Sequence, residues 1–264
     1  MKTDKQKLDF LVTGTGRCGT VYMAELLTSL GIPCGHESFF QMPENSKEVN
    51  QVEKKFEKVI TKKIQPQLSK VSMQPSRDIK GEPARRHPVW VKESEIIADS
   101  SYFSAPFLNH DLLKNTKIIH VVRHPLNVIS SFVEDFNYFQ KTSAPTNDNG
   151  IDATRPTGPE QFIYKNLPIL SNKLSPINRG AIYYIEWNRM IEKSNKIDLL
   201  VQVEKSPEIL MNFLNAKNKS YYKNKKRNSR KRKNTKIKLN DFQPDIRKEL
   251  IKIGTQYGYF LKQI

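Results

Sequence analysis

The chain has 264 residues, of which 37% are hydrophobic, so it can bury the core of one large α/β domain. Its 44 Lys and Arg residues exceed its 27 Asp and Glu residues and give a formal net charge of +17. The apolar stretches are too short to span a bilayer, and the N-terminus lacks the apolar core of a signal peptide. The two cysteines, Cys18 and Cys34, both lie in the glycine-rich region, so we expect a reducing compartment rather than a disulfide-stapled secreted scaffold. We therefore expect a cytoplasmic protein with no membrane span.

Most of the excess positive charge lies in residues 217–238, which we call the basic segment. Twelve of its residues are Lys or Arg and none is acidic. A polyanion, a nucleotide with several phosphates or an acidic surface would suit such a segment. The alternative is a solvated loop that binds no ligand.

Strands and helices are predicted in alternation from the N-terminus onward. The first unit is a buried strand over 8–14, a glycine-rich turn and a helix over 21–32. A polar, Lys-rich stretch over 41–86 follows, and we interpret it as an insertion of helix and loop without a strong core pattern. The second unit begins near residues 89–101, continues through a helix that ends at Lys114, and then has a strand over 117–122 and a helix over 126–136.

The second half of the chain continues this alternation after a long surface loop over 140–160. It predicts helices over 160–170 and 181–193, a buried strand over 197–204, a helix over 206–215 with Ser206 as its cap, and a closing helix over 243–259. Alternating strands and helices predict a single α/β domain over 1–264, with a mostly parallel sheet covered by helices on both faces.

The glycine-rich turn has Gly14, Gly16 and Gly19 at the spacing of a dinucleotide-binding fingerprint. Such a turn presents backbone N–H groups and the positive end of a helix to an anion, so it predicts a phosphate site. Binding of NAD also needs a second strand that ends in an acid about 20 residues later. Glu37 stands at that distance, but one proline and two glycines occupy the place of the strand. An ATP-type loop needs Lys at position 20, where this chain has Thr20.

Arg17 places a cation inside the turn, where it can neutralise charge on a bound phospho-anhydride. The stretch RCGTV resembles the 5′-phosphosulfate loop of the sulfotransferases that use 3′-phosphoadenosine 5′-phosphosulfate (PAPS), with Cys18 in place of Ser and Val21 in place of a second hydroxyl residue. After the predicted strand over 117–122, Arg123, Pro125 and Ser131 have the spacing of that family's 3′-phosphate element. The stretch ADSSYFSAPFL, residues 98–108, is similar to a segment that precedes this element in bacterial and phage members.

This resemblance implies a P-loop NTPase-like three-layer sandwich, with a central mostly parallel sheet flanked by helices. It also implies PAPS as the donor, 3′-phosphoadenosine 5′-phosphate (PAP) as the product, and no metal. The 5′ end would be held through the amides of Gly16, Gly19 and Thr20 and the Thr20 hydroxyl. The basic segment resembles a loop that many members fold over the 3′ end. The full implied donor site comprises Thr15, Gly16, Arg17, Cys18, Gly19, Thr20, Val21, Tyr22, Arg123, Ser131, Arg227 and Arg230.

The stretch CGHE, residues 34–37, resembles a Cys-Gly-Glu-Glu stretch of the tyrosylprotein sulfotransferases, in which the second Glu is the catalytic base. It implies Glu37 as the base, with His36 as the second candidate or as a neighbour that orients Glu37. Arg17 would stabilise the leaving phosphate. The acceptor is a hydroxyl or amine compound, and carbohydrate, peptide tyrosine, lipid and small phenol all fit.

Two other functions stay open at this point. A P-loop-like nucleotide kinase would bind ATP with Mg²⁺, although the missing loop lysine argues against it. A nucleic-acid-binding protein would use the basic segment, but only Tyr221 and Tyr222 add aromatic side chains there, which argues against a base-reading role. We therefore expect no nucleic-acid partner.

Overall fold

The computed structural model describes residues 7–62, 64, 66, 76–77, 83–84, 95–135, 138–140, 158–170, 173–216 and 237–261. Arg227 and Arg230 lie outside these residues, as does almost all of the basic segment. So do residues 141–157 of the long loop and most of the 41–86 stretch beyond residue 62.

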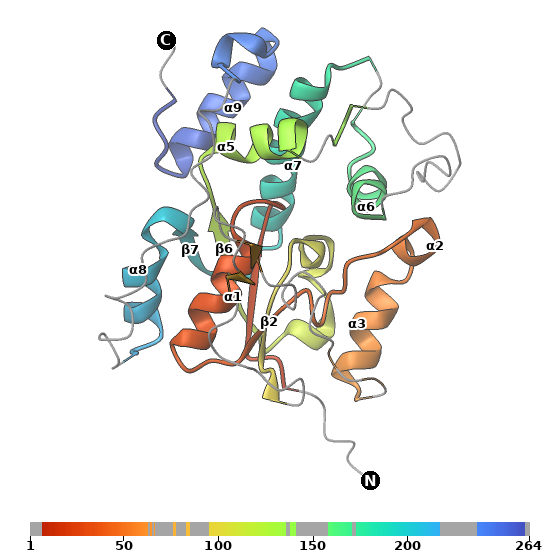
Figure 1. Ribbon diagram of the computed structural model, residues 1–264, viewed down its shortest axis with the longest axis vertical. Helices are drawn as coiled ribbons and strands as arrows, with labels where there is room; N and C mark the ends of the chain where they lie inside the picture. The colour runs from red at the N-terminus through yellow and green to blue at the C-terminus, as the bar shows by residue number, and fades with distance from the viewer. Residues whose placement is uncertain are drawn as a thin grey trace.

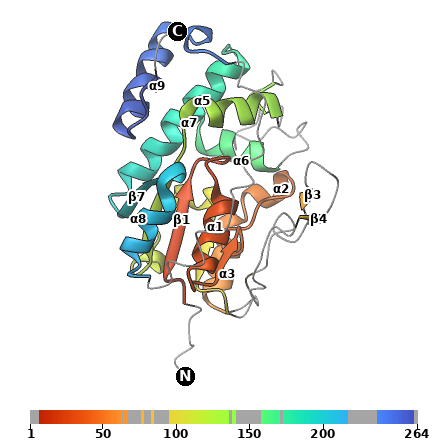
Figure 2. The same ribbon diagram turned by 60° about the vertical axis from the view of Figure 1, so that its left-hand side comes forward.

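The fold is built on a five-stranded sheet with the order β2-β5-β1-β6-β7 (Figure 1). The bounds of its strands are β1 Phe10–Gly14, β2 Cys34–His36, β5 Ala98–Ser100, β6 Lys117–Val122 and β7 Ile197–Gln202. Every pairing in this sheet is parallel, so the carboxyl ends of all five strands lie at one edge. The prediction of a mostly parallel α/β sheet is thereby confirmed. A separate antiparallel pair joins β3 (Ser76–Arg77) to β4 (Pro83–Ala84), as labelled in Figure 2.

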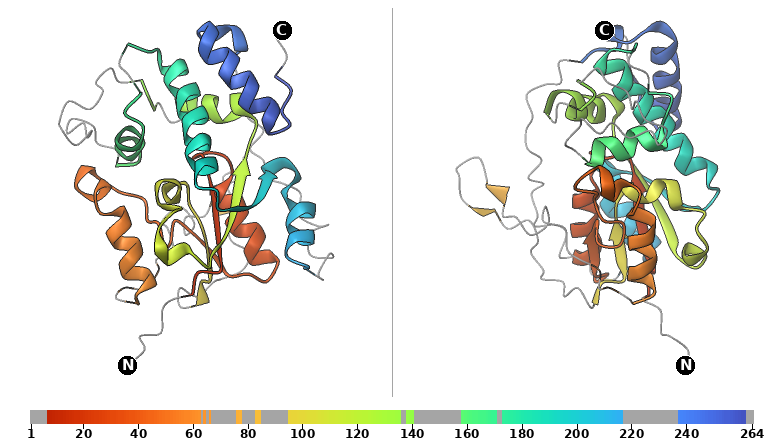
Figure 3. Two further views of the ribbon diagram at one scale, coloured as in Figure 1. Left: turned by 180° about the vertical axis from the view of Figure 1, so that it is seen from behind. Right: turned by 90° about the vertical axis from the view of Figure 1, so that its right-hand side faces the viewer.

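Alternating side chains of the central strands enter two apolar clusters, one on each face of the sheet. Val12 and Ile119 pack in a cluster with α1 (Thr20–Ser29) and α8 (Ser206–Phe213). Leu11 and Ile118, one position earlier on each strand, pack in the larger cluster, to which α3 (Val52–Ile60) and α7 (Pro176–Lys193) contribute. Figure 3 shows the strands between α1 and α8 on one side and α3 on the other. The architecture is therefore consistent with three layers.

The remaining elements continue from these layers. They are α2 (Ser46–Val49), the 3₁₀ helices Tyr102–Phe107, Asp111–Leu113, Val203–Lys205 and Leu239–Asp241, α5 (Pro125–Ser130) with the π-helical turn Ser131–Asp135, α6 (Gly158–Asn166) and α9 (Pro244–Gln256). The carboxyl ends of the strands face the end of the molecule where α5, α6 and α9 lie (Figure 1).

Several predicted elements differ in the structure. The helix expected to end at Lys114 is two short 3₁₀ helices, and Pro106 lies inside the first of them, where it cannot donate a backbone hydrogen bond. The strand expected to be buried over 197–204 is β7, an edge strand whose Leu200 is 44% exposed. Ser206 is the first residue of α8 rather than its cap; its hydroxyl donates to the Val203 carbonyl, and Lys205 occupies the cap position.

Two further differences concern the region after the glycine turn. Strand β2 forms over Cys34–His36 despite Pro33 and Gly35, because it pairs with β5 through backbone hydrogen bonds. Helix α3 lies in the stretch interpreted as an insertion without a strong core pattern, yet its Phe56 and Val59 are fully buried in the larger cluster. Part of that stretch is therefore a structural component of the domain.

Candidate nucleotide site at the glycine loop

The glycine loop, residues 14–19, leaves the carboxyl end of β1 and is held by α7. The indole Nε1 of Trp187 donates to the Gly14 carbonyl over 3.1 Å, and the Gly16 N–H donates to the Tyr183 hydroxyl over 2.7 Å. The Gly16 amide, which the resemblance assigns to phosphate, is thus paired with a buried tyrosine in this structure. At the start of α1, the first N–H that bonds within the helix is that of Met23, which donates to the Gly19 carbonyl over 2.9 Å. The N–H groups from Gly19 to Tyr22 therefore precede the first intrahelical donor. An anion bound at this end of the helix is stabilised by the helix dipole and by hydrogen bonds from the backbone N–H groups.

The three glycines of the loop are each required by a close contact. A Cβ on Gly14 would lie 2.3 Å from the Val121 carbonyl oxygen, and a Cβ on Gly16 would lie 2.6 Å from the ring of Phe132. Gly19 has a φ of 110°, and its Cβ would lie 2.7 Å from the side chain of Val203. The fingerprint spacing is explained here by backbone packing against β6, the turn after α5, and the segment after β7.

The two motifs that are far apart in the sequence meet at this loop. The Arg17 Nε donates to the Ser131 hydroxyl over 3.0 Å, and the Arg123 guanidinium donates to the Arg17 carbonyl over 3.1 Å. These pairs are 114 and 106 residues apart in the chain. The backbone of Arg123 is fixed in turn, because its carbonyl accepts the Tyr184 hydroxyl of α7 over 2.9 Å. Two guanidinium groups and one hydroxyl therefore lie together at the carboxyl edge of the sheet.

Cys18 is not part of this polar group. It is fully buried in the cluster under α1, and burial raises the pKa of its thiol to about 12 against the opposing effects of Arg123 and Arg17. The thiol stays neutral and cannot act as a nucleophile at neutral pH. Val21 and Tyr22 are half-buried in the first turn of α1, and Tyr22 packs against the same cluster. Thr15, also in the expected donor site, is buried.

Glu37 lies directly after β2 and is almost completely buried, at 6% exposure. Its backbone has a left-handed φ of 55°, and its N–H donates to the Ser100 carbonyl of β5 over 3.2 Å. Among the described residues, no group forms a hydrogen bond with its Oε2 atom. Burial first, and then the charge of Asp99, raises the pKa of Glu37 to about 8, while the Arg17 charge opposes this rise. Glu37 is therefore a carboxyl group that accepts or releases a proton close to neutral pH.

His36 connects this carboxyl group to the glycine loop. Its Nε2 atom lies 3.1 Å from the Thr20 hydroxyl and 3.7 Å from Glu37 Oε1. The side chain of Ser100 adds a second connection, since its hydroxyl donates to the Thr20 carbonyl over 2.8 Å. The residues expected to bind phosphate and those expected to accept a proton thus form one connected group.

Other residues of this region had not been expected from the sequence. Tyr102 and Tyr138 are placed so that the charges of both Glu37 and Arg17 act on their hydroxyls, and burial raises the pKa of Tyr138 to about 12. Tyr183 holds the loop amide, and Asp99 accepts hydrogen bonds from the chain after Glu37. One sequence signal was available for Asp99: it is an acidic residue inside the predicted buried segment 89–101.

The described histidines outside this group make packing and hydrogen-bond contacts within the fold. His120 is buried, hydrogen-bonded to Asn188, and burial lowers its pKa to about 4. His110 packs edge-on to Phe56, and His124 packs edge-on to Tyr259. His87 lies outside the described residues. Within the part of the chain that the structure describes, no three His, Cys, Asp or Glu side chains are grouped as metal ligands.

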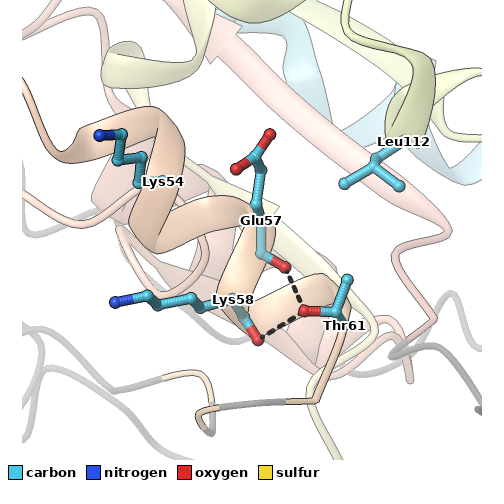
Figure 4. Close-up of a pocket in the computed structure, with 5 residues that line it drawn as sticks. All are labelled: Lys54, Glu57, Lys58, Thr61 and Leu112. Carbon is cyan, nitrogen blue, oxygen red and sulfur yellow. Dashed lines mark hydrogen bonds between the residues drawn. The ribbon is translucent and has the colours of Figure 1, made fainter.

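A hollow on the surface of α3 is separate from the loop. It is lined by Lys54, Glu57, Lys58, Thr61 and Leu112 (Figure 4). The Thr61 hydroxyl donates to the Glu57 carbonyl over 2.7 Å at the end of the helix. None of these residues is among the expected site residues.

No family model matches the chain, and no curated protein matches it. Within the described ranges, none of the helices has both the length and the apolar character that crossing a membrane requires.

Proposed function

We propose that the chain is a sulfotransferase that transfers a sulfuryl group from PAPS to a hydroxyl or amine acceptor. The observation that carries this proposal is the grouping of Arg17, Arg123 and Ser131 beside the buried carboxyl group of Glu37. A donor with a phosphate at each end of one nucleoside needs separate cationic contacts for the two phosphates. We assign these contacts to Arg17 in the loop and to Arg123 and Ser131 after β6.

The donor would be held at its 5′ end by the N–H groups at the start of α1 and by the Thr20 hydroxyl. Its 3′ phosphate would be held by Arg123 and Ser131, with Arg227 and Arg230 as further candidates. Charge-assisted hydrogen bonds of this kind are about twice as strong as neutral ones. Because the Gly16 amide is paired with Tyr183 in the structure, we leave it out of the phosphate contacts and assign it to holding the loop.

The transfer itself would use Glu37 as the general base. The acceptor oxygen or nitrogen attacks sulfur, the bond between sulfur and the bridging phosphate oxygen breaks, and the acceptor proton passes to the Glu37 carboxylate. Arg17 would neutralise the charge that develops on the departing phosphate. A base with a pKa near the working pH is the most effective one for such a proton transfer, and Glu37 meets this condition.

The finer fold assignment, a P-loop NTPase-like sandwich, belongs to the same proposal. Counted along the chain, the sheet order is second, third, first, fourth, fifth. In the dinucleotide-binding fold the second strand lies next to the first. Here β5 separates them, so Glu37 follows an edge strand that does not adjoin β1. This argues for a phosphate loop of another class than that of NAD enzymes.

The test is transfer of ³⁵S from labelled PAPS to a panel with one sugar, one tyrosyl peptide, one simple phenol and one long-chain alcohol. We expect label in at least one acceptor class and a loss of about 100-fold or more in Glu37→Gln, which removes the base. The matched control is Glu57→Gln on the α3 surface, which should keep the wild-type rate. If the label stays in PAPS with every acceptor, or if Glu37→Gln transfers at the wild-type rate, the proposal or its base is wrong.

A further inference from the structure

Asp99 is a fully buried acid in β5 that the proposed reaction has not used. Its carboxylate accepts hydrogen bonds from three consecutive backbone N–H groups, those of Ser38 at 2.9 Å, Phe39 at 3.2 Å and Phe40 at 3.1 Å. These residues directly follow Glu37. A buried carboxylate that accepts several N–H bonds fixes the backbone that donates them.

The backbone of Glu37 is consequently held to β5 on both sides. Its own N–H donates to the Ser100 carbonyl, and the next three N–H groups donate to Asp99. Between these attachments Glu37 adopts a φ of 55°, a conformation that costs a non-glycine residue on the order of 1 kcal/mol or more. Such a conformation persists only where the surrounding contacts enforce it, and Asp99 supplies most of those contacts.

We propose that Asp99 is a positioning residue for Glu37, because its carboxylate fixes the turn that keeps the Glu37 side chain buried beside Arg17 and His36. This inference rests on the proposed function, in which Glu37 is the base. Asp99 does not touch the reacting atoms. It acts through the backbone of residues 38–40 and through its charge.

The charge of Asp99 also affects the pKa of Glu37, and the direction of this effect can be stated. The groups that face Glu37 are His36 on β2, Asp99 on β5, Arg17 in the glycine loop, Tyr102 in the 3₁₀ helix after β5, and Tyr138. Of these, the Asp99 charge raises the pKa of Glu37 and the Arg17 charge lowers it. Burial raises the pKa of Asp99 itself to about 7, so Asp99 is charged in the range near pH 8 in which Glu37 titrates. Replacing Asp99 by a neutral residue should therefore lower the pKa of Glu37.

The experiment is a ¹³C NMR titration of the Glu carboxyl carbons in the whole chain, with Glu37→Gln used to assign the Glu37 signal. We expect Glu37 to titrate at a lower pH in Asp99→Asn than in the wild type, and transfer of ³⁵S to fall about tenfold or more because the turn is loosened. PAP affinity should stay within about threefold, since Arg123 and Ser131 are unchanged. The control is Thr116→Val, which removes a buried hydrogen bond to the Leu8 carbonyl away from the site and should leave the Glu37 titration unchanged.

An unmoved Glu37 titration in folded Asp99→Asn would overturn the inference. If Asp99→Asn does not fold, Asp99→Glu keeps the charge and displaces the carboxylate by one methylene group. We then expect PAP binding to persist, the raised Glu37 titration to remain, and transfer to fall about tenfold; transfer at the wild-type rate would overturn the inference. A wild-type chain that binds no PAP, in which Asp99→Asn still lowers the Glu37 titration, would contradict the proposed function alone and support the action of Asp99 on Glu37.

Discussion

Glu37 combines two features that rarely coincide in a residue with a purely structural role. Its carboxyl group is buried, and within the described structure its Oε2 atom has no hydrogen-bond partner. An unpaired buried polar atom costs about 1–3 kcal/mol of stability. Residues that destabilise the fold in this way are typical of functional sites, because activity there requires groups that lower stability.

The raised pKa of Glu37 predicts how stability depends on pH. Between 4.5, its ordinary pKa, and about 8, its pKa in the folded chain, the unfolded chain ionises this group while the folded chain keeps it protonated. The unfolded state then binds fewer protons, so the free energy of unfolding falls as pH rises through this window, by about 1.4 kcal/mol per pH unit at most. Glu37→Gln cannot ionise at this position and so avoids the loss due to Glu37, while Asp99, whose pKa is raised to about 7, remains in both proteins. The melting temperature of Glu37→Gln relative to the wild type should therefore increase from pH 5 to pH 8. A difference that is constant with pH would contradict the raised pKa.

Ser131 and its neighbour Ser130 offer a matched pair of variants. The Ser131 hydroxyl accepts from Arg17, whereas the Ser130 hydroxyl bonds to Glu134, one turn further along the chain. We expect Ser131→Ala to weaken PAP binding about tenfold, the equivalent of one charge-assisted hydrogen bond, and Ser130→Ala to leave it unchanged. Calorimetric titration of both variants measures this. Equal losses in the two variants would show that the serine on the Arg17 side has no special role.

At the scale of elements, the glycine loop depends on its packing against the segment after β7. Gly19 and Gly31 both have positive φ, at 110° and 88°. A Cβ on Gly19 would meet Val203 at 2.7 Å, whereas a Cβ on Gly31 would meet nothing within 4 Å. An alanine at Gly31 would therefore introduce backbone strain alone, whereas an alanine at Gly19 would add a steric clash.

This pair yields a prediction for Ala variants at the two glycines. Gly31→Ala should cost about 1 kcal/mol of unfolding free energy through backbone strain and should keep PAP binding. Gly19→Ala should cost more and should weaken PAP binding, because the start of α1 must shift to relieve the contact with Val203. Urea denaturation and calorimetry measure the two effects. If Gly19→Ala binds PAP as well as Gly31→Ala does, the start of α1 is not part of the donor site.

The elements that carry periodic apolar patterns could be predicted from the sequence. Strands β1 and β6 and helices α7 and α9 follow from such patterns, and the two expected phosphate motifs lie after β1 and β6. Strand β2 could not be predicted, because two glycines and one proline lie in or near its three residues. It forms because β5 lies beside it and pairs with it. In the sequence α3 resembles part of an insertion, because its Phe56 and Val59, which are buried in the structure, stand among lysines. Both errors arise from tertiary contacts that no local pattern reports.

Some residues of the candidate site could likewise be predicted from the sequence, and others could not. Arg17, Arg123, Ser131 and Glu37 could be named from motifs because their spacing is local to one strand end or turn. Tyr183 and Asp99 could not be assigned, since their roles depend on hydrogen bonds to backbone groups 167 and about 60 residues away. The paired Gly16 amide shows the same limit, because only the packing of α7 reveals it.

At the scale of the whole molecule, the net charge of +17 predicts salt-sensitive binding of a polyanionic nucleotide. We expect PAP affinity to fall about tenfold or more between 50 and 500 mM salt. The double variant Arg227→Ala with Arg230→Ala should flatten this dependence, because it removes two of the cations expected at the 3′ end. The double variant Lys54→Ala with Lys58→Ala removes the same charge on α3 and should leave the dependence unchanged. Equal effects of the two double variants would show that only total charge matters.

The central claim, that the glycine loop and the Arg123 element hold the two ends of PAPS, is tested most directly by calorimetric binding of PAP beside ADP, ATP with Mg²⁺, and NAD. We predict tight binding of PAP alone to the wild type and a loss of about 10- to 100-fold in Arg123→Ala, which removes the charge-assisted bonds that we propose to the 3′ phosphate. Binding of PAP no tighter than that of ADP would contradict the account. Preferential binding of ATP with Mg²⁺ would instead indicate a nucleotide kinase.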